Sequence, residues 1–268
     1  MCKEGFDINE IIAELEGMKF DLNTDVPTIT YEHITRYVEW AKAVLLSDVI
    51  SPFGHSNLNS SLLNFTHLTE TLLEKVCDDY LKKTEEIIRQ LPTIKRFLIK
   101  DTLAIYHGDP AAMSIAEVVL CYPGFLAELI YRIAHCIHVI GVPYMPRMLS
   151  EYAHEKTGID IHPGAKIGES LCIDHGTGIV IGETAEIGDE VRIYQGVTIG
   201  AKSIDEDFSG NALRGKRRHP TIGNRCIIYA GATILGGNTV IGDGCVIGGN
   251  VWITHSIPSY TTVYYDKK

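Results

Sequence analysis

Apolar positions in the first part of the chain recur at helical spacing. Within LTETLLEKVCDDYLKKTEEIIRQL, residues 68–91, Leu72, Val76, Tyr80 and Leu81 fall on one face, with acids and lysines opposite. The segment GFLAELIYRIAHCIHVIGV, residues 124–142, is apolar nearly all round, which predicts a helix buried between others. Prolines at 92, 110, 123, 143 and 146 punctuate the helices. The pattern predicts an all-helical domain over residues 1–157.

After residue 158 the apolar period changes to six. Isoleucines stand at 161, 167, 173 and 179, and after a slip of two residues at 181, 187, 193 and 199. The period resumes at 222, 228 and 234, and after one extra residue at 241, 247 and 253. Such a repeat predicts a parallel β-helix, in which each unit forms one short strand and one turn, with the isoleucines stacked inward. We expect it over residues 158–260, with a tail at 261–268.

One polar segment interrupts this repeat. Residues 201–220, AKSIDEDFSGNALRGKRRHP, carry many charges and lack the period of six. They predict an extended loop that projects from one coil. Long loops on rigid scaffolds commonly carry function.

Several candidate catalytic residues lie within the repeats. Asp174 and His175 interrupt a glycine- and isoleucine-rich stretch, where an acid and an imidazole serve no scaffold purpose. Asp160 lies 15 residues before His175, close to one coil of 18, so we expect the two side chains within hydrogen-bonding reach. An acid bonded to one ring nitrogen would fix the tautomer and leave the other nitrogen as a base. The alternative for any single histidine here is a surface turn residue.

Arg218 and its neighbours are the second candidate group. An arginine can bind a carboxylate through two parallel hydrogen bonds. The segment GKRRH also fits a solvated basic patch, or a clamp for phosphate groups that includes Lys216 and Arg217. By contrast, His135 and His138 lie on the apolar segment 124–142 and are expected to be structural.

A metal site is not expected. The seven cysteines are scattered and contain no CxxC pair, which indicates reduced thiols, several of them core fillers. Some hexapeptide proteins bind zinc through histidines, as the γ-class carbonic anhydrases do with two ligands five residues apart. His175 has no histidine at 170 or 180 to form that pair.

The net charge of the chain and its lack of long apolar segments argue against nucleic acid and membranes as partners. A net charge of −10 argues against sequence-independent nucleic-acid binding, which depends on basic surfaces. The start, MCKEGFDINE, has no apolar leader segment, and no run of 18 uncharged apolar residues follows. We expect a cytoplasmic protein that spans no membrane and binds no nucleic acid.

Several segments together resemble serine O-acetyltransferase, the enzyme that opens cysteine biosynthesis. They are GIDIHPGAKIG, LCIDHGTGIVIGETAEIGDEV, YQGVTIG, RRHPTIG and ATILGG, with GDPAA and YPGFLAELIYRIAH before them. The resemblance covers about residues 100–260. It implies an α+β protein in which an N-terminal all-helical domain precedes a left-handed parallel β-helix of hexapeptide repeats.

The resemblance also implies roles for particular residues. His175 matches the general base that deprotonates the serine hydroxyl, and Asp160 matches its partner. Residues matching the serine ligands are Asp109 and Asp174 for the amino group, and Arg218 and His219 for the carboxylate. Residues matching the backbone that lines the coenzyme A groove are Gly200, Ala201, Ala230 and Gly249. The implied reaction is direct attack of L-serine on acetyl-CoA, with no metal and no covalent enzyme intermediate.

The same resemblance implies an oligomeric state, an inhibitor and a candidate protein partner. It implies a homotrimer with active sites between subunits, or a dimer of trimers, and L-cysteine as a feedback inhibitor in the serine pocket. Many members end in isoleucine, which inserts into O-acetylserine sulfhydrylase, whereas this chain ends in Lys268. We therefore predict that it does not form that complex in the usual way. The loop at 201–220 is also longer and more acidic at its start than the common family pattern.

Three alternatives remain beside this function. A hexapeptide acetyltransferase for a sugar or xenobiotic would lack an amino-acid pocket, and Asp109 with Arg218 argues against it. A non-catalytic assembly or regulatory protein of the same fold would show a broken dyad, yet Asp160 and His175 are both present. A zinc hydratase is disfavoured by the histidine spacing.

Overall fold

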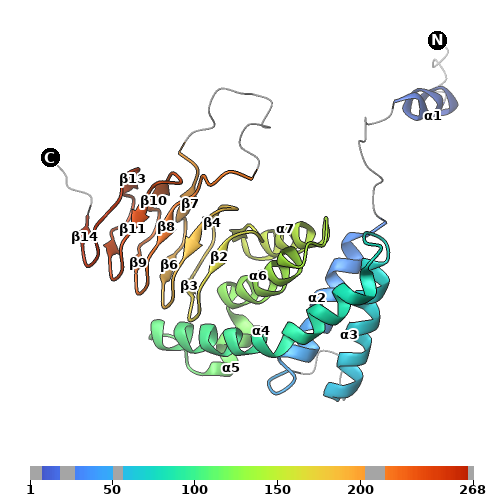
Figure 1. The fold of residues 1–268 in the computed structure, drawn as a ribbon, viewed down its shortest axis with the longest axis horizontal. Coiled ribbons are helices and arrows are strands. Elements are labelled where there is room, and N and C mark those ends of the chain that lie inside the picture. Colours follow the sequence, from blue (N-terminus) through green and yellow to red (C-terminus); the bar gives the residue numbers. More distant parts are fainter. Residues whose placement is uncertain (1–7, 19–27, 51–56, 203–214, 265–268) are drawn as a thin grey trace, which may run out of the picture.

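The computed structural model describes residues 8–18, 28–50, 57–202 and 215–264. Helices come first and short strands follow, and Figure 1 shows α2 to α7 grouped beside one end of a column of strands. The helices are α1 (Ile8–Gly17), α2 (Tyr31–Leu45), α3 (Leu58–Leu73), α4 (Tyr80–Gly108), α5 (Ile115–Cys121), α6 (Pro123–Val139) and α7 (Met145–Thr157). The strands are β1 (Asp160–Ile161), β2 (Lys166–Ile167), β3 (Cys172–Asp174), β4 (Val180–Ile181), β5 (Glu186–Ile187), β6 (Arg192–Tyr194), β7 (Thr198–Gly200), β8 (Thr221–Ile222), β9 (Ile227–Ile228), β10 (Thr233–Leu235), β11 (Val240–Ile241), β12 (Val246–Ile247), β13 (Trp252–Ile253) and β14 (Thr262–Val263).

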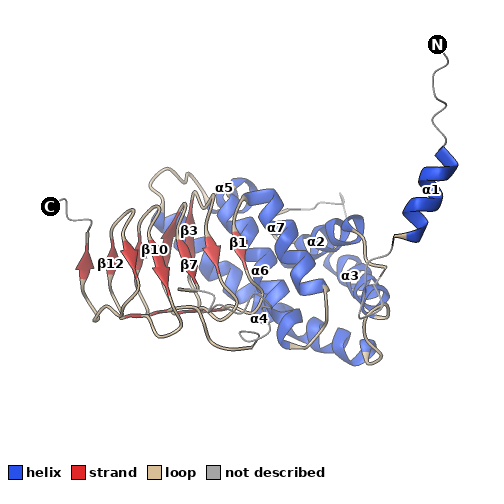
Figure 2. Cartoon of the chain, turned by 90° about the horizontal axis from the view of Figure 1, so that it is seen from above, coloured by secondary structure: helices blue, strands red, loops and turns tan. Residues whose placement is uncertain are grey.

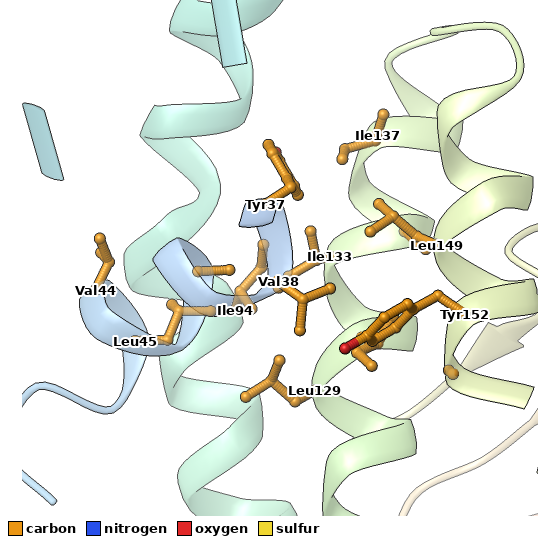
Figure 3. Packing of buried hydrophobic residues seen from close by; sticks show 14 of the residues in the cluster. Tyr37, Val38, Val44, Leu45, Ile94, Leu129, Ile133, Ile137, Leu149 and Tyr152 are labelled. Atoms are coloured by element: carbon orange, nitrogen blue, oxygen red, sulfur yellow. The ribbon is translucent and has the colours of Figure 1, made fainter. Parts of the chain in front are cut away.

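The helices enclose their own apolar core. Figure 3 shows Tyr37 and Val38 of α2 facing Ile133 of α6 and Leu149 of α7. All four side chains are almost completely buried. The prediction that the segment from residue 124 forms a buried helix is confirmed, because most of α6 is covered by its neighbours.

The helix prediction over residues 68–91 was wrong in its boundaries. α3 ends at Leu73, where the carbonyl accepts hydrogen bonds from Val76 and Cys77 and closes a turn, and α4 begins at Tyr80. Leu81, placed on the apolar face, is 59% exposed. Pro92 does not end a helix either but lies inside α4, which packs on α6. A proline removes one backbone hydrogen bond, and tertiary packing can keep the remaining turns helical.

The second half is a parallel β-helix, as predicted (Figure 2). The first sheet has the strand order β1-β4-β7-β10-β13, the second β11-β8-β5-β2 and the third β14-β12-β9-β6-β3. Isoleucines stack inward from coil to coil, for example Ile161 on Ile181 and Ile181 on Ile199. Each coil buries its apolar side against the next, which stabilises the column. Cys172, Cys226 and Cys245 are buried, which confirms the expected core cysteines.

The slip of two residues in the repeat has a definite place in this column. Asp160 pairs with Val180 in a repeat of 20 residues, whereas Val180 pairs with Thr198 in a repeat of 18. The turn after β3 contains the additional residues, because Thr177 accepts a backbone hydrogen bond from Gly196 in the next coil. The longer turn therefore projects at His175.

The β-helix begins directly after α7 and continues past residue 260. α7 ends at Thr157, and Gly158 adopts a left-handed conformation with φ of 70° before β1 begins. At the other end the β-helix reaches past residue 260, because β14 pairs with β12. Within the predicted loop and tail, residues 203–214 and 265–268 lie outside the described residues.

A buried ionic group joins the helical half to the first coil. Arg132 of α6 donates to both carboxylate oxygens of Asp101 in α4 at 3.0 Å, and to the carbonyls of Ile167 and Gly168. The Asp101 carboxylate also accepts the backbone N–H of Leu171 at 2.9 Å. These bonds fix the turn that leads into β3, and thus the strand that precedes His175.

No single helix in the described ranges is both long and apolar enough to cross a membrane, although the bent pair α5 and α6 passes that test jointly by length and composition.

Candidate active site

Two edges of the β-helix carry the predicted site residues. We call the edge where the third sheet turns into the first the histidine edge; its turns are residues 175–179, 195–197, 229–232 and 248–251. The arginine edge is where the first sheet turns into the second; its described turn residues are 162–165, 182–185, 201–202, 215–220 and 236–239.

His175 stands at the N-terminal end of the histidine edge. Its φ is 57°, a left-handed conformation uncommon for residues other than glycine. Gly176 and Gly178, with φ of 86° and 81°, complete the turn, and a Cβ at Gly176 would lie 2.5 Å from the Cδ1 of Ile159. This glycine therefore lets the turn close tightly, and the His175 side chain remains 73% exposed.

Two carboxylates lie near the His175 imidazole. Asp174 Oδ1 is 3.7 Å from His175 Nε2, and the Asp174 side chain is only 15% exposed. Asp109, which follows the end of α4, accepts a hydrogen bond of 2.6 Å from the Tyr122 hydroxyl and one of 2.8 Å from the Ala111 N–H. These bonds, together with the charge of His175, lower the pKa of Asp109 below its ordinary value. Asp109 is therefore an anion at neutral pH on the same edge as the predicted base.

Asp160 lies in the adjacent segment but does not bond to His175. Its partner one coil further is Val180, so the assumption that His175 stacks above it by coil repeat was wrong. The segments do meet at the edge, because Gly178 donates a backbone hydrogen bond of 2.7 Å to Gly158. Among the described residues, the acid within ion-pair distance of His175 is Asp174. The Asp160–His175 hydrogen bond stays a prediction, since such bonds often tighten only when substrate binds.

Arg218 and His219 lie on the arginine edge. The Thr184 hydroxyl oxygen accepts the backbone N–H groups of Arg218 at 2.9 Å and His219 at 3.1 Å. The Arg218 guanidinium pairs with Glu183 through Nη2, while its buried Nη1 has no hydrogen-bond partner. Burial opposes ionisation of Glu183, but the hydrogen bond and charge of Arg218 outweigh it and lower the Glu183 pKa. Nη1 is thus a buried donor that an incoming anion could satisfy.

His219 is held as a neutral ring. Its Nδ1 accepts the backbone N–H of Thr184 at 3.1 Å, which places the proton of the neutral imidazole on Nε2. Burial, and then the charge of Arg218, lower the pKa of His219 to about 4. His219 can therefore donate a hydrogen bond from Nε2 at neutral pH.

The predicted coenzyme A residues divide between the same two edges. Ala230 and Gly249 are successive positions on the histidine edge, where Asn250 donates a backbone hydrogen bond to Ala230. Gly200 is the last residue of β7, and Ala201 follows it at the start of the arginine-edge loop. One chain thus presents two half-sites, with the base and the amino-group ligands on one edge and Arg218 with His219 on the other.

Sequence reasoning missed two residues that organise these half-sites. Tyr122 holds the Asp109 carboxylate, and Thr184 holds the backbone of Arg218 and His219. Neither lies in a motif that indicates a polar contact over such a sequence distance. The partners of both residues become visible only after the chain has folded.

His135 and His138, expected to be structural, differ in their surroundings. His135 Nδ1 lies 2.8 Å from the carbonyl oxygen of Pro163, and burial lowers the pKa of His135. His138 is exposed and lies edge-on to the ring of His162, with 6.2 Å between the centroids. Within the described ranges, no three histidine, cysteine or acidic side chains form a group that could hold a metal ion.

Stability is predicted to fall in mild acid because of one buried and one half-buried histidine. Burial lowers the pKa values of His162 and His219 from 6.5 to about 4. Between these values the unfolded chain binds more protons than the folded chain, so stability rises with pH across this window and is lost as pH falls through it. We expect the urea midpoint to drop between pH 6.5 and pH 4. An equally steep drop in a His162→Asn/His219→Asn variant would contradict this assignment.

Comparison with known proteins identifies the family. A Helicobacter pylori serine acetyltransferase is 48% identical over 163 residues, which cover 61% of this chain and 90% of that relative. The chain belongs to the serine acetyltransferase family. It spans only about half the length of two other curated serine acetyltransferases, 55% of one from Synechococcus elongatus and 52% of one from Synechocystis. No family model matches the chain.

Solved members of the family have the same architecture. Entamoeba histolytica serine acetyltransferase 1, in complex with L-cysteine, is 36% identical with a TM-score of 0.80 and coverage of 96% of both chains. Soybean serine acetyltransferase complexed with serine is 31% identical with a TM-score of 0.62, over 88% of this chain and 93% of that chain. The predicted combination of a helical domain and a parallel β-helix is therefore the fold of this family.

Proposed function

We propose that this protein transfers the acetyl group of acetyl-CoA to the hydroxyl of L-serine, giving O-acetyl-L-serine and CoA, the first step of cysteine biosynthesis. The observation that carries the proposal is the histidine edge, where Asp109 and Asp174 flank the exposed imidazole of His175. Two carboxylates suit the ammonium group of an amino acid, whereas a sugar hydroxyl has no positive charge to pair with them. Membership of the serine acetyltransferase family supports the same acceptor.

Each residue then has a defined task. His175 accepts the proton of the serine hydroxyl as it attacks the thioester carbonyl, and Asp160 orients the ring. Asp109 and Asp174 bind the serine ammonium group. The free Nη1 of Arg218 and the Nε2–H of His219 donate to the serine carboxylate. Neither a metal ion nor a covalent enzyme intermediate enters this sequence of steps.

The histidine edge fits the extended arm of acetyl-CoA. A Cβ at Gly178 would meet only the backbone of Gly196, and one at Gly196 only the backbone of Gly231, so the edge is a bare main-chain floor. The side-chain oxygen of Gln195 on this edge is buried without a hydrogen-bond partner. Such an acceptor suits an amide N–H of the pantetheine arm. Acetyl-CoA bound here would present its acetyl group toward His175.

Division of the site between two edges supports a homotrimer, or a dimer of trimers, as the active form. The first sheet lies between the two edges, and its outer face exposes Trp252 at 70% and Val180 at 38%. An exposed tryptophan on a sheet face is typical of an interaction surface. Packing this face around a threefold axis would bring the histidine edge of one subunit to the arginine edge of the next.

Mixing two inactive variants tests this arrangement. We expect His175→Ala and Arg218→Ala to be nearly inactive alone, whereas co-expressed they should regain activity. Under random assembly about a quarter of the interfaces combine an intact His175 with an intact Arg218. Activity of a co-purified mixture that stays at the level of the single variants would contradict sites shared between subunits. Co-expressed His175→Ala and His175→Asn chains provide the matched negative control.

A Tyr122→Phe variant tests the amino-group pocket. Loss of the hydroxyl frees the Asp109 carboxylate to rotate, so we expect the KM for L-serine to rise about 3- to 10-fold with a smaller change in kcat. The KM for acetyl-CoA should stay within about twofold, because Tyr122 lies beside the acids. Steady-state kinetics with each substrate varied separately measures the difference. An equal rise in both KM values would contradict a specific role in holding Asp109.

Regulation and location are further parts of the proposal. Cysteine has the same amino and carboxylate groups as serine, so the same residues would bind it, and relatives solved with cysteine support an inhibitory role. The terminal Lys268 lies outside the described residues, and the absence of a usual sulfhydrylase complex stays a prediction from sequence. We also propose a cytoplasmic protein that, with a net charge of −10, does not bind nucleic acid.

A further inference from the structure

A column of aromatic side chains borders the histidine edge on the third sheet. Pairing of the strands places one outward position of each coil in line, beginning at Asp174, and the positions are Asp174, Tyr194, Tyr229, Gly248 and Tyr264. The rings of Tyr194 and Tyr229 are stacked, with centroids 5.2 Å apart and planes within 15°. This spacing follows the distance of about 4.8 Å between neighbouring strands.

Gly248 leaves a gap in this column. It is the one position between Tyr229 and Tyr264 and has no side chain, so the two tyrosines stand two coils, or about 9.6 Å, apart at the backbone. A planar ring in van der Waals contact on both faces needs about 7 Å between its neighbours. The Tyr264 ring leans over Gly248, since a Cβ there would lie 2.9 Å from Tyr264 Cδ1. At 68% exposure, the Tyr264 ring has room to swing outward.

The gap lies where the nucleotide end of acetyl-CoA would reach. Gly248 directly precedes Gly249 in the groove, three coils from the turn that carries His175, a distance of about 14 Å. The pantetheine arm contains about thirteen bonds from sulfur to phosphorus, which span roughly 15 Å when extended. An acetyl group at His175 therefore puts the first phosphate at the level of Gly248, and an adenosine folded back at the diphosphate lies over Gly248, between Tyr229 and Tyr264.

We propose that Tyr229, Gly248 and Tyr264 form a stacking site for the adenine ring of acetyl-CoA. The ring lies on the exposed face of Tyr229, over the shelf made by Gly248, and Tyr264 covers it from the other side. Stacking on tyrosine suits a purine, which has a flat polarisable face and no charge. This inference rests on the proposed function, since it assigns a further part of the same donor site.

Comparison of two acetyl donors tests the proposal. S-Acetylpantetheine carries the same thioester and arm as acetyl-CoA but has no nucleotide. We expect Tyr229→Ala to raise the KM for acetyl-CoA at least about 5-fold and to leave kcat/KM for S-acetylpantetheine within about twofold. Tyr229→Phe, which keeps the ring, should behave as wild type. Tyr264→Ala should show a smaller loss with acetyl-CoA alone, and Gly248→Leu should repeat the loss by filling the shelf.

Binding of the nucleotide alone provides a readout independent of activity. Isothermal titration of the full-length protein with adenosine 3′,5′-bisphosphate should show binding that Tyr229→Ala weakens by a similar factor. Tyr260→Ala, which removes another exposed tyrosine outside this column, is the matched control and should change nothing. An equal loss with both donors, or unchanged bisphosphate affinity in Tyr229→Ala, would overturn the stacking site. Wild-type protein that fails to acetylate serine with either donor would instead overturn the proposed function, and the titration would still decide the stacking site.

Discussion

Replacement of His175 with alanine is expected to lower kcat for acetylation of L-serine by at least about 10²-fold, the lower end for loss of a general base. The side chain is 73% exposed and lies on a projecting turn, so its removal creates no core cavity and should leave the fold intact. Release of CoA thiol from acetyl-CoA measures the rate. His255→Ala, an exposed histidine elsewhere in the β-helix, is the matched control and should retain full activity.

The choice of acceptor decides between the remaining functions. Turnover with L-serine that depends on His175 would establish both the reaction and the base. Turnover with a sugar or xenobiotic hydroxyl, but not with L-serine, would keep the acetyltransferase and reject the amino-acid pocket. No release of CoA thiol with any of these acceptors would favour a non-catalytic protein of the same fold. An Asp160→Asn variant with unchanged kcat would remove Asp160 from the proposed dyad.

Replacement of Arg132 with leucine is expected to lower the free energy of unfolding by about 3–5 kcal/mol, because it leaves the Asp101 carboxylate buried without its counter-ion. Asp101 is 0% exposed and Arg132 is 7% exposed. Leucine fills part of the space, so the lost charge and not a cavity should dominate. Urea unfolding followed by circular dichroism, at one fixed protomer concentration, measures the change. The exposed Lys100–Glu169 pair also joins α4 to the first coil, and Lys100→Ala should cost at most about 1 kcal/mol.

A second buried acid, Glu128, lies beside this pair. Burial, and then the charge of Asp101, raise the pKa of Glu128 well above its ordinary value and so favour its neutral form. Asp101 and Arg132 form the ion pair of this group, and removing either leaves the other buried without its partner. An Asp101→Leu/Arg132→Leu double variant should recover part of the lost stability, because neither charge remains. A double variant less stable than Arg132→Leu alone would contradict this account.

The β-helix could be predicted in detail because its sequence signal is local and repeated. Every sixth isoleucine faces the same core, so a small slip is visible against a regular background. The slip of two residues near Asp174 became the projecting turn of His175. Helical boundaries were less predictable. The break between α3 and α4 and the continuity of α4 through Pro92 depend on how helices pack, which periodicity alone does not contain.

The two-part fold could be predicted from the sequence because it rests on repeats, and short motifs pointed to the candidate base and to the acids and arginine around it. The tertiary structure alone decided which of these residues meet. Closure of the coils brings Asp174 to one edge and Arg218 with His219 to another, and docking of α4 brings Asp109 near His175. Folding also brings Tyr122 into contact with Asp109, 13 residues away in the sequence, and Arg132 into contact with Asp101, 31 residues away. Such contacts depend on where a helix docks on the column of coils, and no local pattern encodes that position.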